Sequence, residues 1–417
     1  MTHSACALLT LLALLPNADP RPLNEPFRWR FGDPSDPEWV AERDARIEQI
    51  DRWWRAFEAK ADDIDALFER RQRWDIVDWM ADNLRVIDQR LMWEYGPGLQ
   101  GGHRLVITPE VDRELRPFVD TLLDRAPDLD GWEFYAYRLP EAEVDVEQML
   151  DARDLESLSG AMVEVTVGES HLVDLEFFAP TITGDDDGEA ASAAFVCTEV
   201  LLGEKRLDTW IGAIEVDRGS GGADAVPLDG LHDRVADVIR GVKRELPSKP
   251  IAAIPAESFS WTAWQLEPEE REDYPEQLDL LVGKSMLPDV WIAAHSSWDF
   301  SSERFSRKGE TFCYVKLDGL GGEDRDPVEA KAEIEDALDA ELREAGVGAV
   351  IGGGTGRRYS YVDLALLDVD RALALVRRVL VEMEVPERSW ILFFDAIYAN
   401  EWVGIYAETP SPPVSAR

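Results

Sequence analysis

Apolar side chains recur at helical spacing in two stretches near the start of the chain. The first stretch follows Asp36-Pro37, a pair typical of a helix N-cap and first turn. Its apolar positions are Ile47, Ile50, Trp54 and Phe57, and those of the second are Ile76, Met80, Leu84, Ile87 and Leu91. Because steps of three and four residues place side chains on one helix face, the pattern predicts two amphipathic helices that form a hairpin.

From residue 91 onward the pattern changes to short alternating runs separated by glycine and proline. The predicted strands are residues 91–95, 103–108, 132–139, 162–167, 172–178, 194–202 and 209–216, and the predicted helices are 109–126, 144–152 and 232–246. The runs 162–167 and 172–178 flank a Gly168-Glu-Ser170 turn, which predicts a hairpin. Together these elements predict a mixed sheet with helices, so that residues 27–247 form an N-terminal α+β domain.

The C-terminal half shows strand and helix patterns in regular alternation. The predicted strands are residues 312–317, 349–351, 359–367, 389–396 and 402–406. One helix is predicted from the Asp326-Pro327 cap to Gly346, and another from Asp368. The order β-α-β-β-α-β is that of the split βαβ, ferredoxin-like arrangement, which we expect over residues 251–407.

These patterns predict an α+β protein of two domains. Pro247-Ser-Lys-Pro250 is the expected boundary, because two prolines and a small polar residue are typical of a linker. Residues 1–26 are expected to be a leader or flexible N-terminus. Residues 408–417, which contain three prolines, are expected to be a flexible tail.

The composition sets the class of partner. Of 417 residues, 84 are acidic and 43 basic, which gives a formal charge of −41. Nucleic-acid backbones and anionic membranes both attract clustered positive charge, so this balance argues against both. A hydrophobic content of 45% argues against a disordered acidic chain. We favour a solvated acidic surface, and the alternative is an acidic face that binds a basic protein partner.

The N-terminus raises the question of targeting. Residues 5–16 include the apolar run Cys6–Pro16, which is too short to span a bilayer but has the length of a signal-peptide core. No Lys or Arg precedes the run, which argues against a signal peptide. We therefore expect a cytoplasmic protein, and no other segment approaches the length and hydropathy of a membrane span.

The cysteines and histidines predict neither a metal nor a cofactor. Cys6, Cys197 and Cys313 form no CxxC motif, and the five histidines show no paired spacing. Cys197 and Cys313 both fall in apolar runs that we interpret as strand cores, where a thiol acts as a small hydrophobic group.

The run Gly352-Gly-Gly-Thr-Gly356, followed by Arg357-Arg358, is a candidate ligand-binding site. Gly352, Gly353 and Gly354 could expose backbone N–H groups to a phosphate, and Arg357 and Arg358 could neutralise it. Phosphate loops normally lead from a strand into a helix, however, whereas these glycines are predicted to connect two strands. The alternative is a strand connection that needs positive φ angles.

His295 and Asp299 are the candidate catalytic residues. The segment His295-Ser-Ser-Trp-Asp299 places a base, hydroxyl groups and a carboxylate close together in sequence. No GxSxG motif accompanies them. The alternative is that His295 ends a strand and Asp299 begins a turn.

Acidic residues supply two further candidates. Gly184-Asp-Asp-Asp-Gly188-Glu189 lacks the ligand spacing of a calcium loop and is expected to be a solvated hairpin tip. Asp174 and Glu176 share one strand face by the two-residue period, as paired carboxylates or any solvent-facing pair would.

Six motifs of the N-terminal half form a recognisable set. They are Trp93-Glu-Tyr-Gly96, His103-Arg-Leu-Val-Ile-Thr-Pro109, Ala126-Pro127, Gly131-Trp-Glu-Phe134, Leu202-Gly-Glu204 and Ile211-Gly-Ala-Ile-Glu215. On these motifs, residues 30–245 resemble an uncharacterised bacterial family of unknown function. The resemblance implies a shared fold and no activity, and the C-terminal half resembles no named family.

Two hypotheses of function follow. The favoured one is a soluble, non-catalytic protein that binds a protein partner or a small ligand, for example in an immunity or accessory role. Its acidic surface would suit a basic partner and give fast, salt-sensitive association. The alternative is a hydrolase that uses His295 with nearby carboxylates. Neither hypothesis specifies an oligomeric state.

Overall fold

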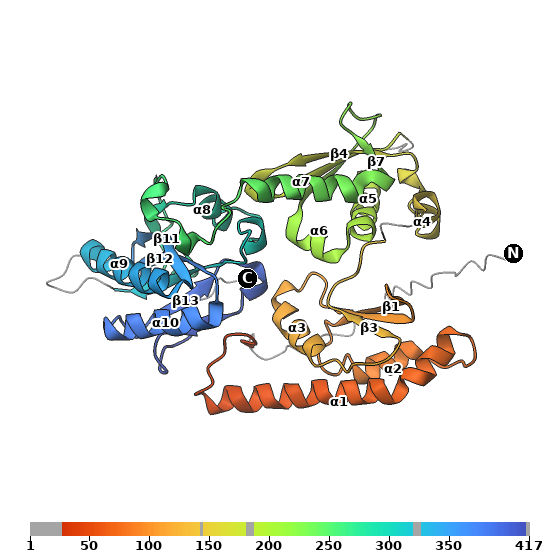
Figure 1. The fold of residues 1–417 in the computed structure, drawn as a ribbon, viewed down its shortest axis with the longest axis horizontal. Coiled ribbons are helices and arrows are strands. Elements are labelled where there is room, and N and C mark those ends of the chain that lie inside the picture. The colour runs from red at the N-terminus through yellow and green to blue at the C-terminus, as the bar shows by residue number, and fades with distance from the viewer. Residues whose placement is uncertain (1–26, 142–144, 181–186, 320–326, 414–417) are drawn as a thin grey trace. The chain divides into compact units, whose positions relative to one another are not determined.

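The computed structural model describes residues 27–141, 145–180, 187–319 and 327–413 (Figure 1). The chain divides into two compact units between Leu139 and Pro140, and each unit is described by itself. The predicted leader, residues 1–26, and residues 414–417 of the predicted tail lie outside the described residues. Helices and mixed sheets occur together, so the α+β class is confirmed.

The boundary expected at Pro247–Pro250 lies inside the second unit, between the two sheets of that unit. Side chains from one sheet region reach the backbone of the other. Arg304 donates to the carbonyl of Thr209 at 2.9 Å, and Nδ1 of His171 lies 3.0 Å from the carbonyl of Arg304. These contacts give a physical reason why the compact unit extends across the proline pair.

The first unit begins with two helices, α1 (Pro37–Phe68) and α2 (Ile76–Asn83). The Asp36 side chain accepts a hydrogen bond from the Glu38 N–H at 2.9 Å, as the predicted cap requires. The second helix is shorter than the predicted stretch 76–91, because Leu84 is its C-cap and residues 84–87 form a turn.

A three-stranded sheet completes the first unit. Its elements are β1 (Met92–Pro97), β2 (His103–Thr108), α3 (Arg116–Asp124) and β3 (Trp132–Tyr135). β2 pairs antiparallel with β1 and parallel with β3, and α3 lies in the connection between the parallel strands. Trp54 and Phe57 of α1 pack edge-on against Phe134 of β3, which places the aromatic side chains of the helix in the core.

The first sheet of the second unit has the strand order β6-β5-β4-β7. Its strands are β4 (Met162–Val167), β5 (Val173–Phe178), β6 (Ile211–Asp217) and β7 (Val226–Pro227), and the helices of this region are α4 (Val146–Ala152), α5 (Asp187–Leu202), α6 (Glu204–Trp210) and α7 (Leu231–Glu245). β4 and β5 form the predicted antiparallel hairpin. β6 pairs parallel with β5.

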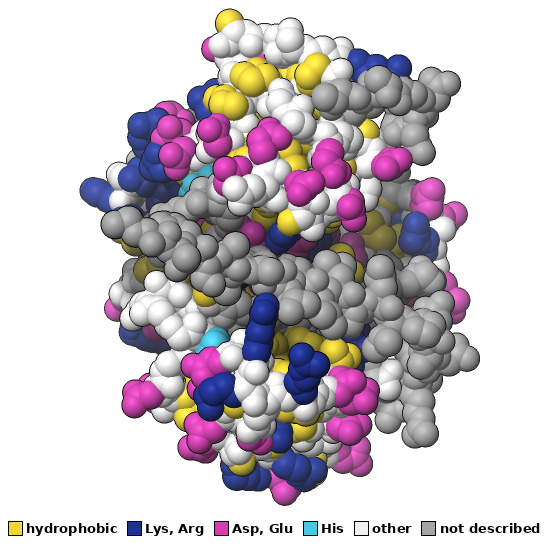
Figure 2. Space-filling model, turned by 90° about the vertical axis from the view of Figure 1, so that its right-hand side faces the viewer, with side chains coloured by type: hydrophobic (Ala, Val, Ile, Leu, Met, Phe, Trp, Pro, Cys, Tyr) yellow, Lys and Arg dark blue, Asp and Glu magenta, His cyan; other side chains and the backbone are white. Residues whose placement is uncertain are grey.

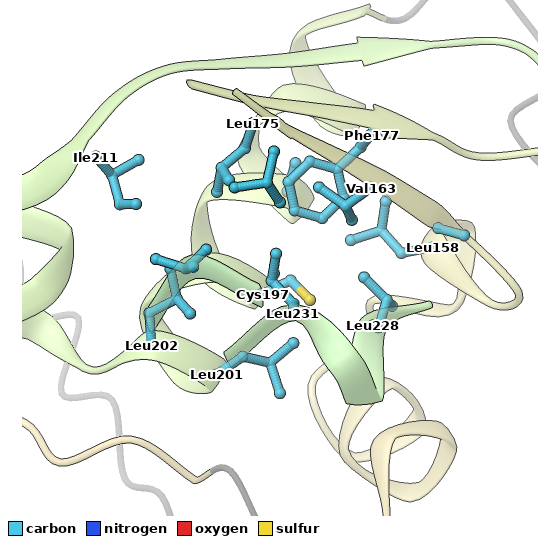
Figure 3. Packing of buried hydrophobic residues seen from close by; sticks show 14 of the residues in the cluster. Leu158, Val163, Leu175, Phe177, Cys197, Leu201, Leu202, Ile211, Leu228 and Leu231 are labelled. Atoms are coloured by element: carbon cyan, nitrogen blue, oxygen red, sulfur yellow. The ribbon is translucent and has the colours of Figure 1, made fainter. Parts of the chain in front are cut away.

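The strand predicted over residues 194–202 is wrong, because these residues belong to helix α5. An apolar run that is buried on most sides fits a helix as well as a strand, so periodicity alone does not separate the two. The Thr198 hydroxyl donates to the carbonyl of Ala194, four residues earlier in the helix, at 2.7 Å. Figure 3 shows Leu175 and Phe177 of the sheet facing Cys197 of α5. Cys197 is buried in the hydrophobic core between the sheet and its helices.

The second sheet of this unit has seven strands in the order β14-β13-β10-β12-β11-β9-β8, and all neighbouring pairs are antiparallel. The strands are β8 (Thr262–Gln265), β9 (Leu280–Ser285), β10 (Thr311–Asp318), β11 (Gly348–Gly356), β12 (Tyr359–Leu366), β13 (Ser389–Phe393) and β14 (Trp402–Gly404). Helices α9 (Pro327–Ala345) and α10 (Val369–Glu382) lie side by side (Figure 1). Among the described residues, no helix combines the length and hydropathy needed to cross a membrane.

Candidate functional site

The candidate glycines lie inside a strand, which corrects the expectation that they form a connection between strands. Gly352, Gly353 and Gly354 belong to β11, which pairs with β12 on one side and β9 on the other. A Cβ atom at Gly353 would lie 2.2 Å from the carbonyl oxygen of Tyr361, and φ at Gly353 is +145°. The glycines therefore allow three strands to approach closely, and their backbone serves the sheet.

The two candidate arginines occupy the turn that follows β11. Arg358 forms a double hydrogen bond with Asp318, at 3.0 and 3.2 Å, and lies 3.5 Å from Asp273. Arg388 binds the same two carboxylates, at 2.8 and 3.0 Å. Arg357 is exposed and donates to the carbonyl of Pro268 at 3.4 Å. Since the Arg358 guanidinium is already neutralised, the geometry gives the predicted phosphate site no support.

A buried carboxylate secures this turn. Asp279 has no exposed surface, and one of its oxygens accepts from the N–H groups of Arg358 and Tyr359, at 2.8 and 2.9 Å. The other oxygen accepts from the Tyr361 hydroxyl. Burial raises the pKa of that hydroxyl. Asp279 thus ties the segment before β9 to the β11–β12 turn, a structural role that the sequence pattern did not reveal.

His295 follows α8 (Pro288–Ala294), a helix where the alternative interpretation placed a strand end. Its ring stacks on Trp291 with centroids 4.1 Å apart, and Trp291 stacks on Trp264 at 3.9 Å. Nδ1 of His295 lies 2.8 Å from the Trp291 carbonyl. Desolvation by the neighbouring rings lowers the pKa of His295 against the opposing effect of that carbonyl, although the residue keeps an exposed edge.

The catalytic pair is not assembled in this geometry. The backbone carbonyl of Asp299 accepts from Arg304 at 2.6 Å, and the imidazole of His295 is hydrogen-bonded to a backbone carbonyl instead of a carboxylate. A general base needs an orienting partner and an accessible proton to abstract. The stacked position of His295 instead makes it part of an aromatic surface beside the edge strand β8.

A row of three glutamates crosses the first sheet of the second unit. Glu164 of β4 lies opposite Glu176 of β5, and Glu176 lies opposite Glu215 of β6. Leu175 and Phe177, the chain neighbours of Glu176, point into the core with α5 and α7, so the row lies on the other face. Glu164 accepts from the Gly222 N–H at 2.8 Å. Within the described part of the chain, Glu176 and Glu215 form no ion pair.

The remaining carboxylate candidates separate into two cases. Asp174 shares the face of Glu176, as predicted, and accepts from the Ala213 N–H at 2.8 Å, which holds β6 against β5. Residues 184–186 of the acidic run 184–189 lie outside the described residues, and residues 187–189 begin helix α5, so the hairpin tip expected there is wrong. On the side of the molecule in Figure 2, acidic side chains are spread among basic ones. The glutamate row therefore differs from the rest of the acidic surface in that the strand register places its three carboxylates side by side. Composition alone could not reveal this alignment.

An open cavity of about 510 Å³ lies in the second unit, where the end of α7 meets residues 302–310. It is lined by Lys243, Ser302, Glu303, Ser306, Arg307, Gly309 and Glu310. The Ser302 hydroxyl donates to Asp395, and the Ser306 hydroxyl donates to Glu310. These two pairs hold the segment 302–310 in place. No sequence motif pointed to this cavity, although four of the chain's eight lysines lie in the segments around it.

Comparisons of the chain with protein-family models, with curated proteins and with solved structures each found no match. The resemblance of residues 30–245 to a bacterial family therefore stays a prediction. The glutamate row and the cavity are the two surface features whose geometry bears on function.

Proposed function

We propose that the chain is a non-catalytic binding protein, with an accessory or immunity-type role, that takes a basic protein partner on the face of β4, β5 and β6 that carries Glu164, Glu176 and Glu215. The glutamate row carries this proposal. Neighbouring strands lie about 4.8 Å apart, so directly opposed glutamates hold like charges close together and destabilise the sheet by a few tenths of a kcal/mol or more per pair. A partner that brings cations to the row relieves this repulsion.

The row has the dimensions of a basic helix. Side chains three and four residues apart on a helix are about 5–6 Å apart, close to the strand spacing across Glu164, Glu176 and Glu215. Met162 and Phe178 face each other in the next row of the same sheet face. The segment at Gly221 lies against the Phe178 ring, so an amphipathic partner helix could place lysines or arginines over the glutamates and apolar side chains beside Met162.

We also propose that residues 311–393 form a ferredoxin-like unit. The strand order β13-β10-β12-β11 supports this, because it places the first and third strands of a β-α-β-β-α-β series at the centre. The contact between α9 and α10 supports it as well. In this proposal the unit is a scaffold, because β11 and its glycines are fully occupied by strand pairing.

The test of function uses a lysine-rich amphipathic helical peptide as the probe, titrated calorimetrically into the full chain at low and high salt. The triple variant Glu164→Gln, Glu176→Gln, Glu215→Gln removes the row. We expect its affinity for the peptide to fall about tenfold or more, since each exposed charge pair contributes a few tenths to about 1 kcal/mol. Binding by the natural sequence should weaken with salt.

A matched control separates the row from general charge attraction. The triple variant Glu257→Gln, Glu270→Gln, Glu344→Gln changes the net charge equally at exposed positions of the same unit. It should bind the peptide as the natural sequence does. Equal affinity of both triple variants would show that the row is no binding site and would overturn the proposal.

A further inference from the structure

We propose that the cavity between the end of α7 and residues 302–310 binds a small molecule that carries a phosphate group. This site is separate from the glutamate row and does not depend on the proposed basic partner. A volume of about 510 Å³ falls in the range of about 300–1,000 Å³ that is usual for small-molecule sites.

Cationic side chains concentrate at this cavity although the chain carries a formal charge of −41. Lys243 and Arg307 line it, and Lys308 follows in the same turn. Lys205 lies 3.9 Å from Glu303 at its edge. Lys249 lies two residues before Ile251 in the chain. The Ile251 N–H donates to Glu310, which lines the cavity, at 2.9 Å.

Two of these cations have no carboxylate partner among the described residues. Among the described residues, the Arg307 guanidinium donates only to the carbonyls of Arg244 and Leu246, both at 3.4 Å, which are long hydrogen bonds. Lys308 is exposed, and its side chain forms no ion pair within the described chain. An incoming anion therefore meets uncompensated positive charge.

The carboxylates of the cavity are already engaged. Glu303 lies 3.2 Å from Lys243, and although burial opposes it, the attraction of Lys243 and Lys205 lowers the pKa of Glu303. Glu310 is 5% exposed and accepts from Ser306 and from the backbone of Ile251. Lys243 and Lys205 thus balance the charge of Glu303, and the hydrogen bonds of Glu310 hold its carboxylate in place inside the protein, so that Arg307 and Lys308 are the cations left to act on a ligand.

The shape and charge of this turn suit a phosphate. Gly309 has φ of +82°, and no atom lies within 4 Å of the position its Cβ would take, so the turn leaves space for a ligand beside Arg307 and Lys308. A phosphate monoester carries about −1.5 to −2 at neutral pH, which two cations match, whereas one carboxylate carries −1. The planar guanidinium can bind two phosphate oxygens at once.

The experiment titrates pyrophosphate into the full chain at low ionic strength, with inorganic phosphate and citrate as comparison ligands. We expect saturable pyrophosphate binding that weakens about tenfold or more in both Arg307→Ala and Lys308→Ala, the size expected for loss of a charge-assisted contact. Arg371→Ala is the control, because Arg371 is exposed on α10 and its side chain forms no ion pair with any residue that the structure describes. It should bind pyrophosphate as the natural sequence does.

Lys308→Ala also guards against a purely structural effect, because the Lys308 side chain is exposed and forms no hydrogen bond or ion pair within the described part of the chain. Its thermal midpoint should equal that of the natural sequence while its affinity falls. The proposal is overturned by absence of saturable pyrophosphate binding, by unchanged affinity in Arg307→Ala and Lys308→Ala, or by equal loss in Arg371→Ala. Tighter binding of citrate than of pyrophosphate would overturn the assignment to phosphate.

Discussion

The ammonium group of Lys316 lies 4.1 Å from the ring centroid of Tyr359, and Lys316 has no exposed surface. It donates to the backbone carbonyls of Tyr274 and Glu276, the second at 2.9 Å. A lysine buried in this way links strand β10 to the segment before β9. Lys316 lies in the same group of contacts as Asp279, Arg358 and Arg388, at the site predicted for phosphate. We call this group of contacts, which ties the segment before β9 to β10 and to the β11–β12 turn, the clasp.

Burial lowers the pKa of Lys316 to about 8, against the attraction of the nearby Asp279 and Asp273. An unfolded lysine titrates near pH 10.4. Between pH 8 and about pH 10 the unfolded chain therefore holds a proton that the folded chain has released, and stability rises with pH by up to about 3 kcal/mol. Above about pH 10 the ionisation of unfolded tyrosines reverses the trend, because burial raises the pKa of Tyr359 and Tyr361.

Urea unfolding of the full chain at pH 7, 8, 9 and 10 tests this linkage. Lys316→Met removes the titrating group, so the rise in unfolding free energy from pH 8 to pH 10 should disappear relative to the natural sequence. Lys249→Met, at an exposed position, should keep the rise. The same slope in Lys316→Met and the natural sequence would contradict the assignment to Lys316.

Replacement of Asp279 should release the clasp. Asp279→Ala leaves the N–H groups of Arg358 and Tyr359 and the hydroxyl of Tyr361 without their acceptor. Loss of a buried, hydrogen-bonded charge destabilises by about 3–5 kcal/mol. Differential scanning calorimetry should show a clear fall in the thermal midpoint of the second unit. The exposed Asp229→Ala should leave the midpoint near that of the natural sequence, and an equally small effect of Asp279→Ala would argue against the clasp.

Gly353 should tolerate no larger residue. Gly353→Ala would place Cβ 2.2 Å from the Tyr361 carbonyl oxygen at φ of +145°, so β11 or β12 would have to move. Backbone strain and overpacking each cost about 1–3 kcal/mol at such sites, so we expect the free energy of unfolding to fall by their sum. At Gly219 the nearest atom to an added Cβ lies 3.9 Å away, and Gly219→Ala should change the urea midpoint little. Equal midpoints for the two variants would refute this account of the glycine run.

The elements that the sequence predicted well carry local signals. Asp36 caps α1 and Asp368 caps α10 through hydrogen bonds to backbone two or three residues ahead, so short sequence windows contain the information. The β4–β5 hairpin has alternating strands on both sides of a short turn. The run 194–202 has no such signal, because the helix α5 buries most of its faces and loses the periodicity that separates helix from strand.

The candidate sites depended on partners that are distant in the chain. The glycines of β11 looked like a loop because their neighbours, β9 and β12, come from residues 280–285 and 359–366. His295 stacks on Trp291, and Trp291 stacks in turn on Trp264 of β8, thirty-one residues before His295, which the segment around His295 does not reveal. The glutamate row needed the parallel pairing of β5 with β6, which no local pattern encodes. The acidic composition left a basic partner as an alternative to a solvated surface, and it could not say which face such a partner would use.

Asp363 provides a second linkage, with the opposite sign. It is 3% exposed, and its carboxylate accepts from the Gln277 amide at 2.9 Å. Burial raises the pKa of Asp363 to about 7, although Gln277 and Lys331 act to lower it. Between pH 4 and pH 7 the folded chain therefore holds a proton that the unfolded chain has lost. This group contributes stability below pH 4 that is lost as the pH rises through 7.

Asp363→Asn isolates this contribution, because an asparagine keeps the acceptor oxygen for Gln277 and never ionises. The unfolding free energy of the variant minus that of the natural sequence should grow as the pH rises from 4 to 8. At pH 8 it should reach the order of 3 kcal/mol in favour of the variant. Other carboxylates titrate alike in both proteins, so the difference removes them, and Asp229→Asn at an exposed position should show no such growth. A difference that stays constant from pH 4 to pH 8 would mean that Asp363 is ionised throughout. The buried carboxylate would then need a nearby cation to balance its charge, because it would not be neutralised by a bound proton.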